Sequence, residues 1–487
     1  MSRASSIKRL GRRKSVVPKA RRENLRILVQ PVVAAFSRPA FWLSLALVAN
    51  VLEGALRKWV PGFSGGAGRI FAYFSKDIIL GIGVVTLLAG RQRRSVALTS
   101  LSDWGGIAFA FIGVGALFGL SQGFNATGAA LSLRALVILP LFGYLYSGRV
   151  TRFPIIGFAL VAVFLTAINA PLSLIQSGLP ASHILNKYAE DEMIVVEVAS
   201  GVRATGTFAY LSGPAMVAVL GLWGGMVLLS LGKNRVTQML GALGVLSASA
   251  CAFASGSRGA LVVVVATLGL WALSSVRASR VLWRSLWLAG ILALAVLLVF
   301  PSLAGRFVIM GEGVFDRFET AGDSNSRRAF GQFEELLHAV IHHPIGTGLG
   351  TEQVGGNYVA SGVAGFTQYE NQFPRIVAEV GLLGFVGFVL LVIATLLALQ
   401  ETRGDSRYWR WNLVVTATQI TLLGQFYGSL VFNHTASAMV WLIATAVLAA
   451  APVTTRRPRW RRSNKRRIRK IEPESSAEEL SDTAGGA

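Results

Sequence analysis

The stretch 380-VGLLGFVGFVLLVIATLLAL-399 decides the fold class, because it runs for 20 residues without a charged side chain. At a rise of about 1.5 Å per residue, a helix of this length crosses the roughly 30 Å hydrocarbon core of a bilayer. The stretch therefore predicts a transmembrane helix, which we place over about 376 to 400.

Similar apolar runs recur along the whole chain and predict an all-α integral membrane protein of about twelve transmembrane helices. The other eleven lie near 40–57, 71–90, 104–121, 130–147, 153–176, 207–231, 236–254, 259–275, 283–303, 411–430 and 435–453. They define a transmembrane domain over 39–453, between a tail at 1–38 and a tail at 454–487.

The composition agrees with lipid as the solvent, since 53% of the 487 residues are hydrophobic and only 15% are charged. The net charge of +23 would suit a nucleic-acid-binding protein. However, much of it sits in the basic tail at 1–38 and in the tail at 454–487, which is first basic and then acidic. Basic segments beside a membrane bind anionic lipid headgroups. We therefore expect anionic lipids, and no nucleic acid, as partners of the tails.

The basic residues of the short loops give the orientation, because cytoplasmic loops are enriched in Lys and Arg. Every second predicted loop carries them: Arg91, Arg93, Arg94, Arg149, Arg152, Lys233, Arg235, Arg277, Arg280, Arg284, Arg403, Arg407 and Arg410. This alternation predicts cytoplasmic positions for both termini. We expect the first helix to be retained, since no small-residue cleavage site follows it.

Two predicted extracytoplasmic connections are long, an acidic one over about 177–206 and a larger one over about 304–375. A loop of the second length is usually functional. Its segment from Arg327 to His343 has the apolar spacing of an amphipathic helix, which suits the membrane surface.

Several ionisable residues lie at or inside the ends of the spans, where a charge is costly unless it is paired or serves a function. They are Glu53, Arg57, Lys58, Asp77, Arg134, Arg203, Arg258, Glu370 and Glu379. Glu53 and Arg57 are four residues apart, so we expect a local ion pair on one helix. The single cysteine, Cys251, excludes an internal disulfide and a cysteine-based metal site.

The motif Val202-Arg203-Ala204-Thr205-Gly206-Thr207-Phe208 opens the predicted sixth helix on the extracytoplasmic side. A guanidinium there suits a bidentate clamp for a diphosphate, although an arginine that snorkels to the interface would explain it too. The motif Ser255-Gly256-Ser257-Arg258-Gly259-Ala260 predicts a tight turn on the same side.

After the amphipathic helix, Pro344 is followed by Gly346, Gly348 and Gly350. No predicted strand precedes these glycines, which argues against a nucleotide-binding loop. The spacing of Glu334, His338 and His342 is compatible with zinc ligation, but the sequence indicates no further zinc ligand.

Four motifs, taken in order, resemble the O-antigen ligase and O-antigen polymerase family. They are the Arg203 motif, the Ser-Arg-Gly-Ala turn, the Arg-led helix with its Pro-x-Gly-x-Gly-x-Gly end, and Glu370-Asn371 with Gly381 and Gly384. The motifs span about 200 to 385. The resemblance implies a GT-C-like helical fold in the bacterial inner membrane. It also implies metal-independent, cofactor-free, inverting transfer of a glycan from an undecaprenyl-diphosphate carrier to a glycan or lipid acceptor.

The resemblance also assigns site residues. Arg203 and Arg327 or Arg328 match the arginines that hold the donor diphosphate, and Arg258 matches the Ser-Arg-Gly turn. In the ligases a histidine precedes the motif asparagine, whereas this chain has Glu370 before Asn371.

A carboxylate can act as a general base toward an acceptor hydroxyl. Glu370 is therefore either that base or a structural acid that pairs with an arginine, and we favour the base. Asn371, Glu379 and His343 are further candidates, and Glu379 equally suits a pairing with a neighbouring helix.

Two other functions remain open from the sequence alone. A flippase or exporter of lipid-linked glycans would also have twelve helices and buried charges, but transporters commonly show two related halves. A non-catalytic component of polysaccharide assembly is the other alternative. Polymerases and ligases share these motifs, so the motifs do not separate them.

Overall fold

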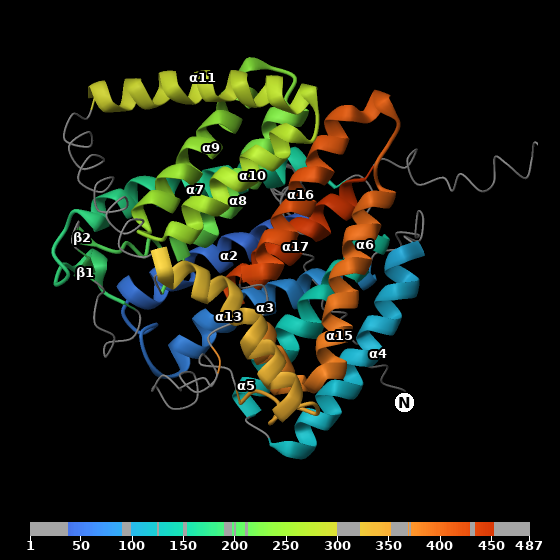
Figure 1. Cartoon of the computed structure of the whole chain (residues 1–487). Coiled ribbons are helices and arrows are strands. Elements are labelled where there is room, and N and C mark those ends of the chain that lie inside the picture. Colours follow the sequence, from blue (N-terminus) through green and yellow to red (C-terminus); the bar gives the residue numbers. More distant parts are fainter. Residues whose placement is uncertain are drawn as a thin grey trace, which may run out of the picture.

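The computed structural model describes residues 38–89, 99–123, 126–149, 153–188, 197–198, 201–209, 213–299, 322–351, 369, 372–428 and 434–451. Nearly all of these residues are helical (Figure 1). The first half contains α2 (Pro39–Trp59), α3 (Gly66–Ala89), α4 (Thr99–Gln122), α5 (Ala126–Leu133), η1 (Arg134–Ile138), α6 (Leu139–Arg149), α7 (Ile155–Ser177) and η2 (Ile184–Asn186).

The second half begins with two short antiparallel strands, β1 (Glu197–Val198) and β2 (Gly201–Val202). The helices that follow are α8 (Gly213–Leu231), α9 (Arg235–Ala254), α10 (Arg258–Leu273), α11 (Val276–Val299), α13 (Gly322–His342), α15 (Gln372–Glu401), η3 (Ser406–Tyr408), α16 (Trp409–Gly428) and α17 (His434–Ala450).

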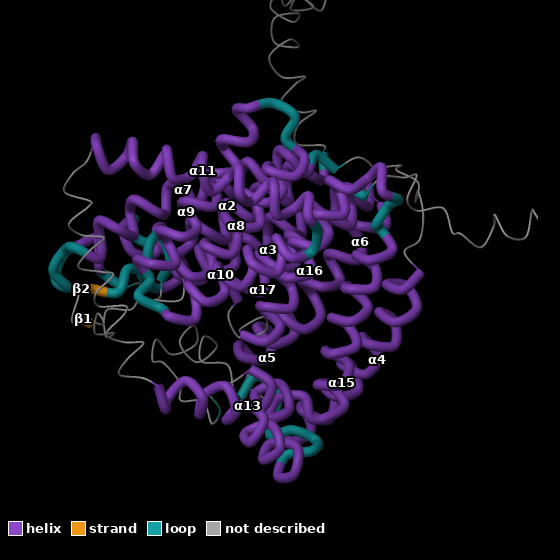
Figure 2. The backbone as a smooth tube through the Cα atoms, turned by 45° about the horizontal axis from the view of Figure 1, so that its top comes forward, coloured by secondary structure: helices purple, strands orange, loops and turns teal. Residues whose placement is uncertain are grey.

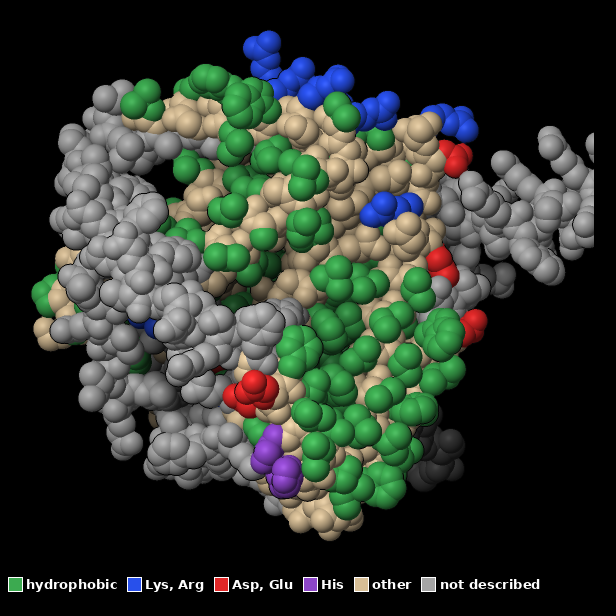
Figure 3. Space-filling model, viewed as in Figure 1, with side chains coloured by type: hydrophobic (Ala, Val, Ile, Leu, Met, Phe, Trp, Pro, Cys, Tyr) green, Lys and Arg blue, Asp and Glu red, His purple; other side chains and the backbone are tan. Residues whose placement is uncertain are grey.

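The outside of the helical bundle is apolar. Eight described helical stretches are long and apolar enough to cross a membrane, and one of them joins α5, η1 and α6. Two shorter apolar helices cover Gly259–Leu273 and Ala436–Ala450. Large side chains such as Leu117, Phe164 and Val265 are more than 60% exposed. Figure 3 shows apolar side chains over α4 and α15, and Lys and Arg along the upper edge. This distribution is that of a multi-pass membrane protein, whose apolar surface faces lipid.

The centre of the bundle is α8, which packs between α7 and α9 and is the most deeply buried of the candidate spans. Its Trp223 is fully buried, and the indole Nε1 donates a hydrogen bond to Thr418 Oγ1 of α16 at 2.9 Å. The ring of Phe158 from α7 packs edge-on against Trp223. The hydrogen bond satisfies the polar atom of the buried indole. Together with the ring contact, it fixes α8 against α16 and α7.

Helices α4 and α15 lie side by side in both ribbon views (Figures 1 and 2). Gly115 and Gly384 make the approach possible, since a Cβ on Gly115 would come within 2.6 Å of the Gly384 nitrogen. Small residues allow such close helix contact in membranes. Helix α15 is kinked at Gly381, whose φ of +68° favours glycine.

Several predicted boundaries shift. The predicted span 207–231 begins only at Gly213, because Thr207 and Phe208 belong to an irregular segment. The predicted span 283–303 begins earlier, at Val276, so Arg277, Arg280 and Arg284 lie on α11 rather than in a loop. The amphipathic helix expected from Arg327 to His343 is confirmed as α13, and it begins five residues earlier than predicted.

Candidate functional site

The segment 201–209, here called the Arg203 segment, crosses the end of the bundle before α8. Arg203 is partly buried, and its Nε donates a hydrogen bond to the Ser255 carbonyl at 3.2 Å. The Ala204 amide also donates to the Ala254 carbonyl. The structure therefore brings together two motifs that are about 50 residues apart in the sequence.

Burial lowers the pKa of the Arg203 guanidinium from its ordinary value, and the nearby Tyr188 acts in the opposite direction. An arginine keeps its proton in proteins nevertheless. Arg203 thus provides a fixed positive charge with donor atoms beyond the one that contacts Ser255.

Two buried amide side chains of α7 hold the Arg203 segment. Gln176 Oε1 accepts hydrogen bonds from the amides of Thr205 (3.2 Å) and Gly206 (2.7 Å). Asn169 Oδ1 accepts from the Thr207 amide at 2.9 Å. Since buried backbone groups need partners, these contacts replace the helical bonds that the irregular segment lacks.

Lys58 of α2 contacts the same segment from the other side. Its Nζ donates to Thr205 Oγ1 at 2.9 Å and to the Gly206 carbonyl at 2.7 Å, and the residue is only 6% exposed. Gly54, one helical turn earlier, makes room for the segment, because a Cβ there would lie 2.2 Å from the Ala209 nitrogen. Lys58 therefore attaches α2 to the Arg203 segment.

The neighbouring turns of α2 and α3 form a buried ion cluster with η1, which we call the α2–α3 ion cluster: Glu53, Arg57, Lys76, Asp77 and Arg134. The expected pair of Glu53 and Arg57 forms, with 3.3 Å between Oε1 and Nη1. Lys76 Nζ also bonds Glu53, and Arg134 Nε lies 2.8 Å from Asp77 Oδ1.

The ring of Tyr73 lies at the centre of this cluster. Arg57, Lys76 and Arg134 all place their cationic groups 5.0–5.9 Å from the ring centroid. Contacts of this kind stabilise a desolvated cation. Three helical elements therefore place their cations around one aromatic side chain.

Among the described residues of the α2–α3 ion cluster, cations outnumber carboxylates. The cluster has three cations and two carboxylates, and the described hydrogen bonds of the adjacent Lys58 go to neutral oxygen atoms. Arg134 is 3% exposed, and its Nη1 and Nη2 have no hydrogen-bond partner among the described residues. Buried charge of one sign is costly, so this region is suited to an anionic ligand.

The glycines after α13 join that helix to α4 and α15. The Leu349 amide donates to the Gly119 and Gly123 carbonyls of the α4 end, and the Thr347 amide donates to the Ala378 carbonyl of α15. The Leu382 amide, next to the kink, donates to the Pro344 carbonyl. This turn thus packs helices together, which agrees with the sequence argument against a nucleotide loop.

The remaining candidates lie near this turn. Glu379 is fully buried and accepts a hydrogen bond from Ser132 of α5. His338 Nδ1 lies 3.2 Å from the Tyr369 hydroxyl, and the rings of His338 and His342 stack. His343 directly follows α13 and has a partly buried side chain.

Other predicted site residues are only partly described. Glu370 and Asn371 lie outside the described residues, as do the side chains of Arg258, Arg327 and Arg328, whose backbones belong to α10 and α13. Among the described residues, no three His, Cys, Asp or Glu side chains converge as metal ligands.

Sequence reasoning missed the roles of Lys58, Lys76, Gln176 and Asn169. The two lysines carried a signal, since Lys58 is a cation at the end of the predicted span 40–57 and Lys76 is a cation within the span 71–90. The two amides carried none, because polar uncharged residues are common in membrane helices.

Residues 243–389 match the sequence model of a family described as O-antigen ligase. The match covers the Ser255–Ala260 turn, α13 and the kink of α15, and it leaves the Arg203 segment and the α2–α3 ion cluster outside. The resemblance that the motifs predicted is therefore confirmed over this part of the chain. No curated protein matches the sequence.

Proposed function

We propose that this chain, which has an O-antigen ligase domain over residues 243–389, is a glycosyltransferase of surface-polysaccharide assembly. It transfers a glycan from an undecaprenyl-diphosphate carrier to a glycan or lipid acceptor at the extracytoplasmic face of the bacterial inner membrane. The domain match supports glycan transfer of the O-antigen ligase or polymerase type. The charges at the site support the proposed donor and mechanism.

The observation that carries the proposal is the group of described cations at and beside the Arg203 segment, which are Arg203, Lys58 and those of the α2–α3 ion cluster. Arg203 bonds a carbonyl, Lys58 bonds neutral oxygen atoms, and Arg134 keeps two donor nitrogens without a partner among the described residues. A diphosphate offers the negative charge and the acceptor oxygens that such groups need.

The chemistry is a single displacement. The acceptor hydroxyl oxygen attacks the anomeric carbon while the bond from that carbon to the diphosphate oxygen breaks, and the bonding electrons leave with the lipid diphosphate. The hydroxyl proton passes to the base, for which we propose the Glu370 carboxylate. Fixed cations stabilise the leaving charge without a metal ion, and inversion at the anomeric carbon follows from the single attack.

The position before Glu370 supports its assignment. Tyr369 is buried against α13, where Ala339 packs on it and His338 contacts its hydroxyl group. The Arg375 side chain donates a hydrogen bond to the Tyr369 carbonyl. Tyr369, the residue before Glu370 in the sequence, is thus anchored to both α13 and α15.

We also propose the full topology of about twelve spans, with the loop over 304–375 extracytoplasmic and both tails cytoplasmic and in contact with anionic lipids. Two connections that were predicted to be cytoplasmic, α10–α11 and α15–α16, support this topology, because residues of both line one pocket. The helical architecture suits a GT-C-like enzyme.

Purified wild-type protein in proteoliposomes, supplied with a lipid-diphosphate oligosaccharide and an acceptor, tests this function. We expect a new glycosidic product from wild type and its loss in Glu370→Gln. Arg407→Ala, which removes an exposed arginine of η3 in the α15–α16 connection, should keep wild-type activity. Translocation of the donor without any product would instead show a flippase.

A further inference from the structure

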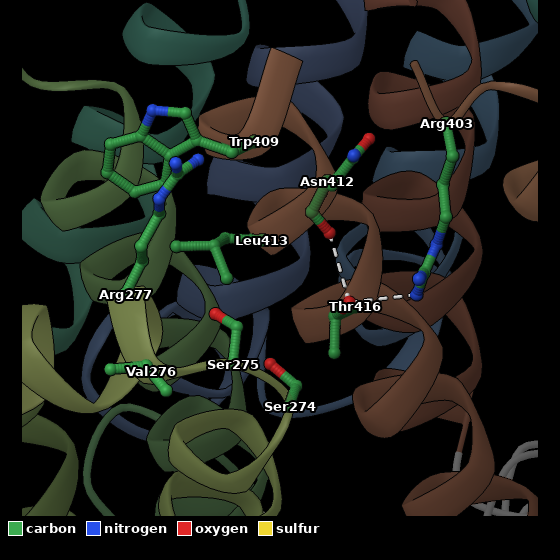
Figure 4. A pocket seen from close by; sticks show the side chains of 9 residues that line it. All are labelled: Ser274, Ser275, Val276, Arg277, Arg403, Trp409, Asn412, Leu413 and Thr416. Atoms are coloured by element: carbon green, nitrogen blue, oxygen red, sulfur yellow. Dashed lines mark hydrogen bonds between the residues drawn. The ribbon is translucent and has the colours of Figure 1, made fainter. Parts of the chain in front are cut away.

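A pocket of about 440 Å³ lies between the α10–α11 turn and the start of α16 (Figure 4). Arg203 contacts Ser255 before α10, whereas the pocket begins at Ser274 after α10. Ser274, Ser275, Val276 and Arg277 form one wall, and Arg403, Trp409, Asn412, Leu413 and Thr416 form the other. This volume falls in the range of small-molecule sites.

The two arginines belong to different parts of the chain. Arg277 is the second residue of α11, and its guanidinium carbon lies 5.3 Å from the centroid of the Trp409 ring. Arg403 lies in the α15–α16 connection, and its Nη2 donates to Thr416 Oγ1 (2.8 Å) and Gln419 Oε1 (2.7 Å). Both cations are thus held in place by neutral partners.

Positive charge in the pocket is not balanced by its lining residues. None of them is acidic, and neither Arg277 nor Arg403 forms an ion pair with a described residue. The buried Nε of Arg403 has no hydrogen-bond partner among the described residues, and burial lowers the pKa of this guanidinium. Glu401 and Asp405 lie nearby in the chain but do not line the pocket.

The surroundings of the pocket are those of a membrane interface. Leu273 is 83% exposed and Val276 69% exposed, directly beside Arg277, and Trp283 and Trp287 are exposed further along α11. Exposed tryptophans are typical of the headgroup level, and the exposed aliphatic side chains suit acyl chains.

We propose that this pocket binds the phosphate headgroup of an anionic phospholipid from the leaflet at this face, with the phosphate between Arg277 and Arg403. The acyl chains then run along the exposed apolar side chains of α10 and α11. The bound lipid ties the α10–α11 turn to the α15–α16 connection. Basic pockets between membrane helices bind lipid headgroups in this way.

Native mass spectrometry of the full chain tests the proposal with phosphatidylglycerol, phosphatidylethanolamine and inorganic phosphate as separate probes. The double variant Arg277→Ala/Arg403→Ala removes both pocket cations. The matched control Arg280→Ala/Arg407→Ala removes one exposed arginine from α11 and one from the α15–α16 connection, and neither lines the pocket.

We expect wild type and the control to retain one phosphatidylglycerol, and the pocket variant to bind it at least about tenfold more weakly. An equal loss in both variants would assign lipid binding to general surface charge and overturn the proposal. Retention of inorganic phosphate in preference to the lipid would overturn the lipid assignment. If the pocket variant does not fold, Arg277→Gln alone should still weaken binding relative to Arg280→Gln.

Discussion

Lys58 Nζ donates a hydrogen bond to the Gly206 carbonyl at 2.7 Å, so a cation of α2 holds the segment that carries Arg203. The two residues are 148 positions apart, and only the folded bundle brings them together. The adjacent residue Arg57 belongs to the α2–α3 ion cluster. One turn of α2 therefore contacts both the Arg203 segment, through Lys58, and the α2–α3 ion cluster, through Arg57. We propose that the cations of both bind the diphosphate.

Lys58→Met keeps most of the side-chain volume and removes the ammonium group. We expect the rate of glycan transfer to fall about tenfold to a hundredfold, because Arg203 loses its fixed position. Hydrogen exchange of the Thr205, Gly206 and Thr207 amides should become faster. Lys233→Met, an exposed change in the α8–α9 connection, is the control. Unchanged exchange in Lys58→Met would show that Lys58 does not hold the segment.

Gly206→Ala tests the conformation of the same segment. Gly206 has a φ of +58°, and a Cβ there would lie 2.6 Å from Asn169 Oδ1. We expect a loss of about 1–3 kcal/mol in the free energy of unfolding, measured by thermal unfolding in detergent. Gly269→Ala in α10, where a Cβ meets nothing within 4 Å, should not destabilise the protein. An equal effect of both changes would rule out local strain.

Asp77→Asn removes the carboxylate that lies 2.8 Å from Arg134 Nε. Because Arg134 is 3% exposed, its charge is then left buried without a counter-ion, and we expect a destabilisation of about 3–5 kcal/mol. The double variant Asp77→Asn/Arg134→Gln should be less destabilised than Asp77→Asn alone. A double variant that is less stable than either single change would contradict the pairing.

Ligand binding tests whether Arg134 belongs to the anion site. A lipid diphosphate should raise the midpoint of thermal unfolding of wild-type protein, because a ligand that binds only the folded state stabilises it. Arg134→Gln should reduce this increase, since Nη1 and Nη2 are then absent. The same increase in wild type and variant would exclude Arg134 from the site.

The sequence predicted the membrane class, the positions of most helices and the amphipathic helix, because apolar runs and helical spacing are local signals. The pairing of Glu53 with Arg57 was predictable for the same reason, since the residues are one turn apart. The meeting of Arg203 with the Ser255 turn was not predictable from spacing. It depends on how α7, α8 and α9 pack, which local patterns do not encode.

The irregular Arg203 segment shows why one boundary prediction was wrong. Thr207 and Phe208 follow the apolar pattern of the next helix, but Asn169, Gln176 and Lys58 provide its backbone with other hydrogen-bond partners. Tertiary contacts thus override the local preference. The role of Arg134 could not be predicted from the sequence for a similar reason, because its partner Asp77 lies on a different helix.

The most direct measurement is the rate of glycan transfer from a lipid diphosphate by purified Arg203→Ala, with wild type and Arg407→Ala measured beside it in the presence of EDTA. We expect wild type and Arg407→Ala to transfer the glycan at the same rate. We expect Arg203→Ala, with an unchanged unfolding midpoint, to be slower by a factor of about 10²–10³, because the leaving diphosphate loses a fixed cation. Transfer by Arg203→Ala at the wild-type rate, or a wild-type rate abolished by EDTA, would contradict the proposed mechanism.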